Sequence, residues 1–247
     1  MNYNDFSLFY DGLTNDVDYQ KRTDYILNIF EKFDRKPTLL LDLACGTGGF
    51  SIETAKRGIS VIGVDVSVGM LNVARQKVAD ENADVLLLNQ DAAELDLYGT
   101  VDGAICCLDS VNHITDGDDV QKAFDKVSLF LEKDRLFVFD VNTEFKHKNV
   151  LSGKNYVFEN DQVFCVWQNS DCQADGTVDI ELDFFKKDGD VYERYSEDFS
   201  ERAYPLEDLT EKLKKSGFEV LAIFGDLSFS SVTDTDERAV FVARKVR

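Results

Sequence analysis

LDLACGTGGFS, residues 41–51, runs from an apolar stretch that contains an acid, Asp42, into the glycines Gly46 and Gly48. The apolar residues predict a strand before the glycines, and the residues after them predict a helix. Glycines between a strand and a helix allow the backbone to approach a bound cofactor closely. The segment therefore predicts a cofactor site at the end of this strand.

Strand and helix patterns alternate on both sides of this segment. Apolar runs predict strands at 38–43, 60–65, 85–89, 101–108, 135–141, 219–224 and 238–244. Helical spacing of apolar residues predicts helices at 18–34, 50–57, 68–79, 118–131 and 206–217. Ser67 is expected to cap the third of these helices. Short strands separated by helices indicate an α/β fold with a doubly wound, mostly parallel sheet covered by helices on both faces.

Residues 150–203 have a different character. Four alternating stretches rich in aromatic residues predict strands with no helix between them, and Asp-Gly pairs at 175–176 and 188–189 supply hairpin turns. This segment is predicted to be a small antiparallel β insertion in one α/β domain that comprises residues 1–149 and 204–247.

The composition narrows the class of protein and its partners. The chain has 247 residues, 44% of them apolar, which suits one domain with an insertion. A formal net charge of −20 opposes binding to DNA, RNA and anionic membranes and favours a small or cationic partner, unless the charge serves only solubility. Five cysteines without a CxxC pair indicate reduced thiols. With neither a signal peptide nor an apolar run of about 18 residues, a cytoplasmic protein is expected.

Two classes of cofactor fit the glycine loop. A dinucleotide requires G-x-G-x-x-G and an acid about 20 residues further on; Gly46, Gly48 and Asp65 match, and Ser51 stands at the third glycine position. Asp42 opposes this alternative because its charge would repel a pyrophosphate. A phosphate-free nucleoside with a cationic amino-acid end fits better, since Asp42 attracts the cation and Asp65 accepts both ribose hydroxyls. S-adenosylmethionine has this chemistry, and NAD is the alternative.

Between residues 38 and 142 the sequence resembles the class I S-adenosylmethionine-dependent methyltransferases. Four segments resemble the family's motifs in order, each at the end of a predicted strand: LLDLACGTGGFS, GVDVSVGML, NQDAAEL and VDGAICCLDSVNHI. The C-terminal part matches loosely, and Ala44 stands where a third glycine often lies. The resemblance implies a Rossmann-like seven-stranded sheet in the order 3-2-1-4-5-7-6, with strand 7 antiparallel and ligands at the carboxyl ends of the strands.

The resemblance also implies roles for individual residues. Asp65 would bind the ribose, Met70 would lie near the adenine, Asp91 would bind the adenine amino group and Ala92 would make a backbone contact. Tyr10 would lie over the methionine part. The other residues placed at the cofactor are Asp42, Ala44, Cys45, Gly46, Gly48, Val66, Gln90 and Leu108.

Each of these assignments has a simpler structural alternative. Asp42 is alternatively an acid that caps a helix, Asp65 a surface acid and Asp91 an ordinary turn residue. Cys45 is expected to fill space in the loop rather than to act as a nucleophile.

His113 is the candidate catalytic residue. It follows the fourth predicted strand in DSVNHI, where members of the family often place a histidine on the acceptor side. It would deprotonate an amine or a hydroxyl group, and the alternative is a packed, hydrogen-bonded histidine at a helix start. Some O-methyltransferases bind magnesium with acids at positions such as Asp109, Asp140 and Asn142. The spacing here disfavours that alternative, and no metal site is predicted.

The sequence thus predicts a cytoplasmic methyltransferase that uses S-adenosylmethionine to methylate a nitrogen or oxygen atom of a small molecule. The exit from the fourth strand lacks the N/D-P-P-Y/F pattern of amide and base N-methyltransferases, which argues against DNA adenine and glutamine targets. The insertion would form a lid over the acceptor. Its aromatic residues would form a small core, with some of them facing the acceptor: Phe158, Phe164, Trp167, Phe184, Tyr192 and Tyr195.

The alternative functions are an NAD-dependent oxidoreductase and a non-catalytic regulatory module that binds S-adenosylmethionine. The oxidoreductase would need an acid–base pair for hydride transfer, which the sequence does not reveal.

Overall fold

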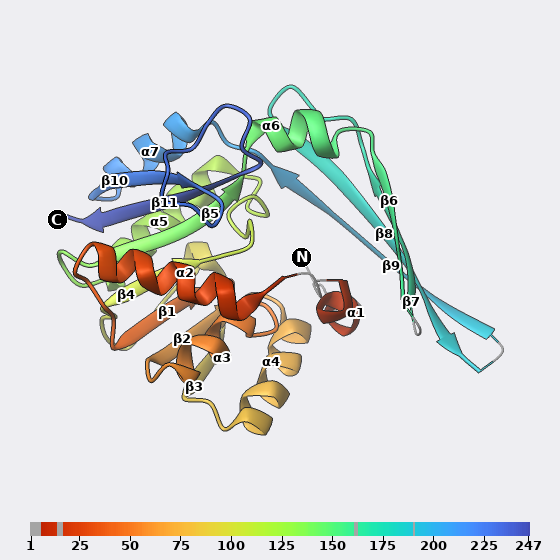
Figure 1. Ribbon diagram of the computed structural model, residues 1–247, viewed down its shortest axis with the longest axis horizontal. Helices are drawn as coiled ribbons and strands as arrows, with labels where there is room; N and C mark the ends of the chain where they lie inside the picture. The colour runs from red at the N-terminus through yellow and green to blue at the C-terminus, as the bar shows by residue number, and fades with distance from the viewer. Residues whose placement is uncertain (1–5, 14–16, 161–162, 190) are drawn as a thin grey trace.

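The computed structural model describes residues 6–13, 17–160, 163–189 and 191–247. Its central sheet has seven strands in the order β10-β11-β5-β4-β1-β2-β3 (Figure 1). These strands are β1 (Leu39–Leu43), β2 (Ser60–Asp65), β3 (Val85–Asn89), β4 (Gly103–Cys106), β5 (Leu136–Asn142), β10 (Phe218–Gly225) and β11 (Arg238–Lys245). β11 pairs antiparallel with both β5 and β10, and the other neighbouring strands are parallel. The expected order 3-2-1-4-5-7-6 is confirmed, with β11 as strand 7.

Helices cover both faces of this sheet (Figure 1). The longer helices of the described chain are α1 (Phe6–Leu13), α2 (Tyr19–Lys32), α3 (Gly49–Lys56), α4 (Val68–Glu81), α5 (Gly117–Phe130) and α7 (Leu206–Lys215). The short ones are η1 (Ala92–Glu94), α6 (Glu144–Lys146) and η2 (His147–Leu151), and α1 and α6 lie toward the second sheet rather than on the central one (Figure 1). Ser67 caps α4, as expected, by accepting a hydrogen bond from the Met70 N–H at 3.2 Å. Helices α1 and α6 and the π-helical turn η2 are not predicted from the sequence. None of the described helices is long and apolar enough to cross a bilayer.

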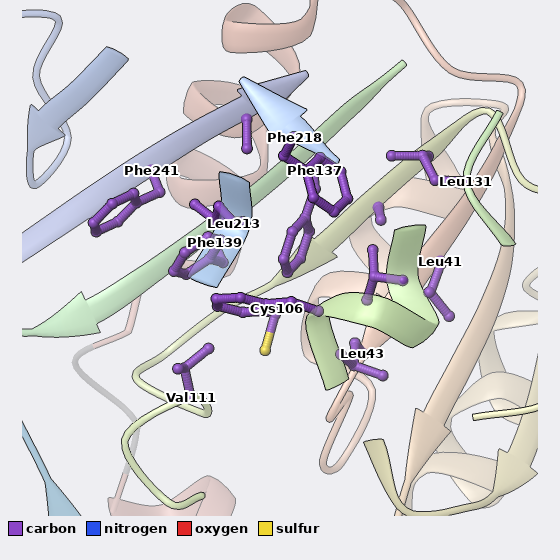
Figure 2. Packing of buried hydrophobic residues seen from close by; sticks show 14 of the residues in the cluster. Leu41, Leu43, Cys106, Val111, Leu131, Phe137, Phe139, Leu213, Phe218 and Phe241 are labelled. Carbon is purple, nitrogen blue, oxygen red and sulfur yellow. The ribbon is translucent and has the colours of Figure 1, made fainter. Parts of the chain in front are cut away.

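Strand β5 shows how the sheet builds a core on each face. Side chains alternate along a strand, so Phe137 and Phe139 point to one face while Leu136 and Val138 point to the other. Phe139 stacks on Phe241 of β11 with ring centroids 4.8 Å apart, in a cluster covered by α5 and α7 (Figure 2). Leu136 and Val138 join a second cluster under α2. Burial on both faces explains why this strand is a nearly continuous apolar run.

A second, antiparallel sheet follows β5 in the chain. Its strands, in order, are β6 (Asn155–Glu159), β7 (Val163–Asn169), β8 (Thr177–Asp188) and β9 (Val191–Arg202). Alternate residues of β8 from Val178 to Phe184 are buried. Phe9 of α1 stacks on Phe184 with ring centroids 4.7 Å apart, so α1 fills the space between the two sheets (Figure 1).

Two sequence-based expectations fall partly on residues outside the described ranges. The segment expected to lack a signal peptide begins with residues 1–5, and the expected turn at 188–189 adjoins residue 190, which lies outside the described ranges.

We expect Phe139→Ala to lower the free energy of unfolding by about 3–5 kcal/mol, because a buried aromatic ring would be replaced by a cavity. Urea denaturation measures this change. Tyr98→Ala is the control, since Tyr98 is fully exposed and its removal should leave the unfolding midpoint unchanged. Equal losses in the two variants would contradict the packing described.

Candidate functional site

The loop between β1 and α3 uses its small residues for different reasons. Ala44, Gly46 and Gly48 have positive φ angles of 57°, 54° and 80°. Gly48 packs against α4, where an added Cβ would lie 3.3 Å from the Ala74 Cβ. An added Cβ at Gly46 would meet nothing within 4 Å, so this part of the loop faces open space. Ala44, which departs from the family pattern, holds a left-handed conformation that glycine adopts more easily.

Asp42 is a buried carboxyl group at the end of β1. It is 2% exposed and accepts a hydrogen bond from the Ser51 hydroxyl at 2.5 Å. Burial raises the pKa of Asp42 to about 7, although the Ser51 hydroxyl and N–H lower it; the nearby charge of Asp65 raises it further. Because Ser51 lies in the first turn of α3, Asp42 also has the capping role considered as the alternative.

Asp65, at the end of the neighbouring strand β2, ties two loops together. One carboxylate oxygen accepts from the Gly46 N–H and the other from the Ser67 N–H, both at 2.8 Å. Burial raises the pKa of Asp65, whereas these N–H groups and the charge of His113 lower it. Each oxygen keeps a second acceptor position, so the carboxylate can still accept two ribose hydroxyls.

The residues after β2 and β3 form the wall where the adenine is expected. Val66 is 47% exposed, whereas Met70 is buried. Asp91 is exposed and accepts the Ala93 N–H at 2.8 Å, so it does cap the turn η1, which begins at Ala92. The Gln90 side chain is engaged with the backbone of Asp96 through two hydrogen bonds of 3.0 and 2.9 Å. Because both the side-chain nitrogen and the side-chain oxygen of Gln90 are already hydrogen-bonded, this side chain is less available to a ligand than the sequence suggests.

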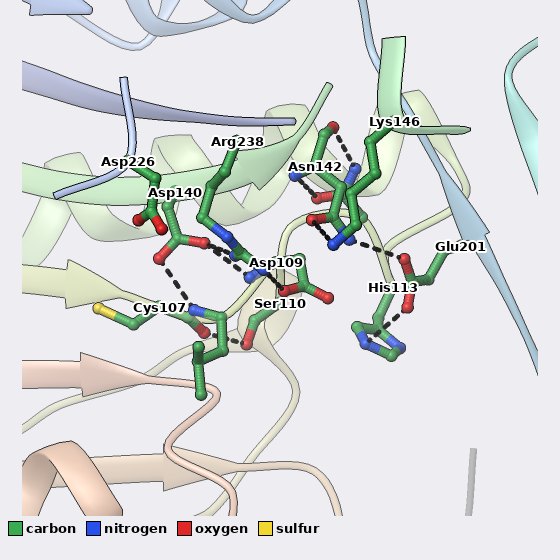
Figure 3. A network of polar contacts seen from close by, with 12 residues as sticks. Cys107, Asp109, Ser110, His113, Asp140, Asn142, Lys146, Glu201, Asp226 and Arg238 are labelled. Carbon is green, nitrogen blue, oxygen red and sulfur yellow. Dashed lines mark hydrogen bonds and ion pairs between the residues drawn. The ribbon is translucent and has the colours of Figure 1, made fainter. Parts of the chain in front are cut away.

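The predicted fourth strand ends earlier than expected, at Cys106 instead of residue 108. Leu108 and Asp109 have φ angles of 55° and 53°, which a strand does not allow. The carboxylate of Asp140, at the end of β5, accepts the N–H groups of both residues at 2.9 Å (Figure 3).

Arg238 of β11 neutralises this turn by pairing with both Asp140 and Asp109 (Figure 3). Burial raises the pKa of Asp109, but the charges of Arg238, Lys146 and His113 outweigh burial and hold that pKa well below its usual range. The guanidinium therefore pairs with two of the three residues that the magnesium alternative would use.

His113 lies just beyond this turn and faces a glutamate from the second sheet. Its Nε2 is 3.6 Å from Oε1 of Glu201, a buried residue of β9. The His113 ring also packs on Phe199 with centroids 5.2 Å apart. The ligand atoms of Asp109, His113 and Glu201 all lie within 4.8 Å of one another.

Tyr10 and Cys45 complete the predicted site. Tyr10 is carried by α1, and its phenol is hydrogen-bonded to Tyr19; burial raises the pKa of Tyr10 well above its usual value. Burial also raises the pKa of the Cys45 thiol, which agrees with a space-filling role. Tyr10 lies within electrostatic range of Asp109, which places α1 on the same side of the sheet as the β4 turn.

Comparison with known proteins identifies the family. The profile of a methyltransferase domain matches residues 40–134. YqeM of Bacillus subtilis (strain 168), a protein named as a methyltransferase, is 31% identical over 246 residues, which cover 99% of this chain and 98% of YqeM. The chain belongs to the class I S-adenosylmethionine-dependent methyltransferases.

Solved structures agree with this membership. An S-adenosylmethionine-dependent methyltransferase from Clostridium acetobutylicum ATCC 824 is 33% identical, with a TM-score of 0.90 over 99% of both chains. The sugar N-methyltransferase KedS8 from Streptoalloteichus sp ATCC 53650 is 19% identical, with a TM-score of 0.80 over 98% of this chain and 93% of KedS8. At 19% identity, the likeness to KedS8 shows only that the two proteins share a fold.

The residues of this methyltransferase fit its cofactor, S-adenosylmethionine. Gly46 leaves open space beside two buried carboxyl groups, Asp42 and Asp65. Within the described ranges, neither carboxyl group forms an ion pair with a lysine or arginine; their neighbours are hydroxyl and N–H groups. Unpaired carboxylates beside an open loop favour a ligand that carries positive charge. A pyrophosphate is negatively charged and would be repelled by these carboxylates. The geometry therefore disfavours the dinucleotide alternative.

Sequence reasoning missed three residues of the methyltransferase site. Arg238, Glu201 and Asn112 reach it from elements far apart in the sequence, or through contacts that no local pattern reveals. One signal was available for Arg238, because it is a charged residue at the start of the apolar strand RAVFVAR.

The cofactor should bind more tightly as pH rises through the pKa of Asp42. Its cation favours the ionised carboxyl group, and a pKa of about 7 makes that form about tenfold more populated at pH 8 than at pH 6. We therefore expect calorimetry to show about tenfold tighter binding of S-adenosylmethionine at pH 8 than at pH 6. Asp42→Asn is the control, because it keeps an acceptor for Ser51 and removes the titration. A wild-type affinity that changes with pH no more than that of the variant would contradict this account.

Proposed function

We propose that this methyltransferase transfers a methyl group to the amino nitrogen of a small molecule, with His113 as the catalytic base. The observation that carries the proposal is the cluster of carboxylates around His113. Asp65 and Asp109 lie within electrostatic range of His113, and Glu201 lies 3.6 Å away. These carboxyl groups attract an ammonium group through its charge, whereas a neutral hydroxyl group could gain only hydrogen bonds from them.

The chemistry of such an acceptor requires a base. The bound cofactor supplies an electrophilic methyl group on a sulfonium centre. An ammonium nitrogen has no lone pair until it loses a proton, and His113 takes that proton in the proposed mechanism. The glycine loop and Asp65 contribute by holding the reactants in line, which supplies much of the acceleration in this reaction.

The nature of the acceptor draws support from two further observations. KedS8, named as a sugar N-methyltransferase, shares the fold across nearly the whole chain, including the second sheet. The net charge of −20 opposes binding to nucleic acid, since a polyanion gains nothing from counterion release.

The proposed location is the cytoplasm. The five cysteines form no disulfide bonds, which suits a reducing compartment: Cys45, Cys106, Cys107, Cys165 and Cys172.

We further propose that residues 150–203 form a lid over the acceptor. Phe199 of β9 packs on the His113 ring, and Phe9 packs on Phe184 and Tyr195 of the same sheet. These contacts support a role for the second sheet and α1 in excluding water from the acceptor side of the site.

Replacement of His113 tests the proposal. We expect His113→Ala and His113→Gln to lower kcat about 10²–10⁴-fold while the cofactor Kd stays within a few-fold, because a general base is lost and the cofactor contacts remain. The assay measures S-adenosylhomocysteine formed with a panel of small amines and amino sugars. His113→Gln keeps a hydrogen-bond donor toward Glu201, so a wild-type rate in this variant would rule out the base. Turnover confined to hydroxyl acceptors would overturn the amine assignment.

A further inference from the structure

Glu201 is a buried carboxyl group that stands between two histidines. It is 3% exposed, with Oε1 3.6 Å from Nε2 of His113 and Oε2 3.6 Å from Nε2 of His147. The chain contains two histidines in total, so both of them face this one side chain. One buried carboxyl group therefore links the proposed base, His113, to the second histidine, His147.

His147 determines what one oxygen of Glu201 does. The His147 ring is fully buried, and its Nδ1 lies 2.9 Å from the carbonyl oxygen of Gly176, which can only accept. Nδ1 therefore carries a hydrogen. Nε2 has no hydrogen-bond partner among the described residues and faces Oε2 of Glu201, which also accepts from Asn142 Nδ2 at 3.2 Å. Two facing lone pairs repel, so one proton lies on Nε2 or on Oε2.

The other oxygen of Glu201 is then an acceptor in either case. If Nε2 of His147 holds the proton, Glu201 is a carboxylate and Oε1 accepts. If Oε2 holds the proton, Oε1 is the carbonyl oxygen of the acid and again accepts. The Nε2 of His113 that faces Oε1 must accordingly donate.

We infer that Glu201 is a positioning residue that holds His113 as the Nε2–H tautomer, which makes Nδ1 the nitrogen that takes the proton of the acceptor. This inference rests on the proposed function, in which His113 is the base. The separation of 3.6 Å exceeds that of a formed hydrogen bond, and such contacts in catalytic sites tighten when the substrates bind.

The register between the second sheet and the central domain supports this pairing. Asn112 precedes His113, and Arg202 follows Glu201. The Arg202 N–H donates to the Asn112 carbonyl at 2.8 Å, and Asn112 Nδ2 donates to the Arg202 carbonyl at 2.9 Å. These two hydrogen bonds fix β9 against the β4 turn one residue away from the Glu201–His113 contact.

The charges that face His113 favour the same arrangement. Glu201 approaches from β9, Asp65 from β2 and Asp109 from the turn that leads to His113. Of the nearby cations, Arg238 pairs with Asp109 and Lys146 donates to Asn142 Oδ1 at 3.0 Å. The carboxylates stabilise the imidazolium that forms when His113 takes a proton. The second sheet therefore contributes Glu201 to the positioning of the base, in addition to covering the acceptor side of the site.

Glu201→Gln tests the inference because an amide has one acceptor and one donor end. Asn142 Nδ2 donates to the Oε2 position, so the amide oxygen should lie there, with a hydrogen on Nε2 of His147 facing it, and the NH₂ group should face His113. That arrangement requires an acceptor at His113 Nε2 and so reverses its tautomer, leaving no basic Nδ1. We expect kcat to fall about 10²-fold or more, with the cofactor Kd and the acceptor KM within a few-fold.

The direct readout is the tautomer of each histidine, measured by ¹⁵N NMR of histidine-labelled protein saturated with S-adenosylhomocysteine. His113→Gln removes one set of signals and so assigns both. We expect His113 to be the Nε2–H form in the wild type and the Nδ1–H form in Glu201→Gln. His147 should keep its Nδ1–H in both proteins. Glu181→Gln, an exposed change on β8, is the matched control and should alter neither tautomer nor kcat.

The outcomes separate the inference from the proposed function. The same His113 tautomer in the wild type and in Glu201→Gln would overturn the inference, even if methylation of amines is established. A reversed tautomer in a protein that methylates no amine would uphold the structural role of Glu201 and reject the proposed acceptor. Loss of wild-type activity in EDTA, restored by a divalent cation, would overturn the inference by showing that Asp109, His113 and Glu201 form a metal site.

Discussion

The carboxylate of Asp140 holds the turn after β4 in a conformation that the site depends on. Leu108 and Asp109 are consecutive non-glycine residues with positive φ, which is rare and strained. Asp140 satisfies both of their N–H groups, and Arg238 balances the buried charge. This turn leads directly to Asn112, which binds the second sheet, and to His113, the proposed base. The antiparallel strand β11 is therefore needed for chemistry as well as for the sheet, because it brings Arg238 to this turn.

A site with this many acids is tolerated because each carboxyl group is compensated differently. Asp42 has a pKa raised to about 7 by burial, and Asp65 is held by backbone N–H groups. Asp109 shares Arg238 with Asp140, and Glu201 lies 3.6 Å from a ring nitrogen of each of the two histidines. The two carboxyl groups nearest the glycine loop, Asp42 and Asp65, form no ion pair with a lysine, arginine or histidine within the described ranges. A cationic cofactor completes the balance there, which is why the same acids exclude a pyrophosphate.

The sequence predicted the elements whose signal is local. β2 and β3 match their predicted limits, since apolar runs bounded by turns mark buried parallel strands clearly. Helix α1 was missed because eight residues are too few to be stable alone; it is held by Phe9 against Phe184 of a distant strand. Within the candidate site, His113 was proposed because it follows a predicted strand at a position where the resembled family often places a histidine. Glu201 and Arg238 were missed because their partners lie on elements far away in the chain. Nothing in the neighbourhood of Glu201 distinguishes it, and the one local signal for Arg238 is its charge at the start of an apolar strand.

The most direct measurement is a crystal structure of the protein with sinefungin, a stable analogue of the cofactor. The account predicts the ribose hydroxyls within hydrogen-bonding distance of Asp65, the amino-acid end over Gly46 on the side of Asp42, and His113 on the side where the methyl group would leave. A nucleoside bound away from Asp65, or a His113 ring turned away from both Glu201 and the analogue, would contradict it.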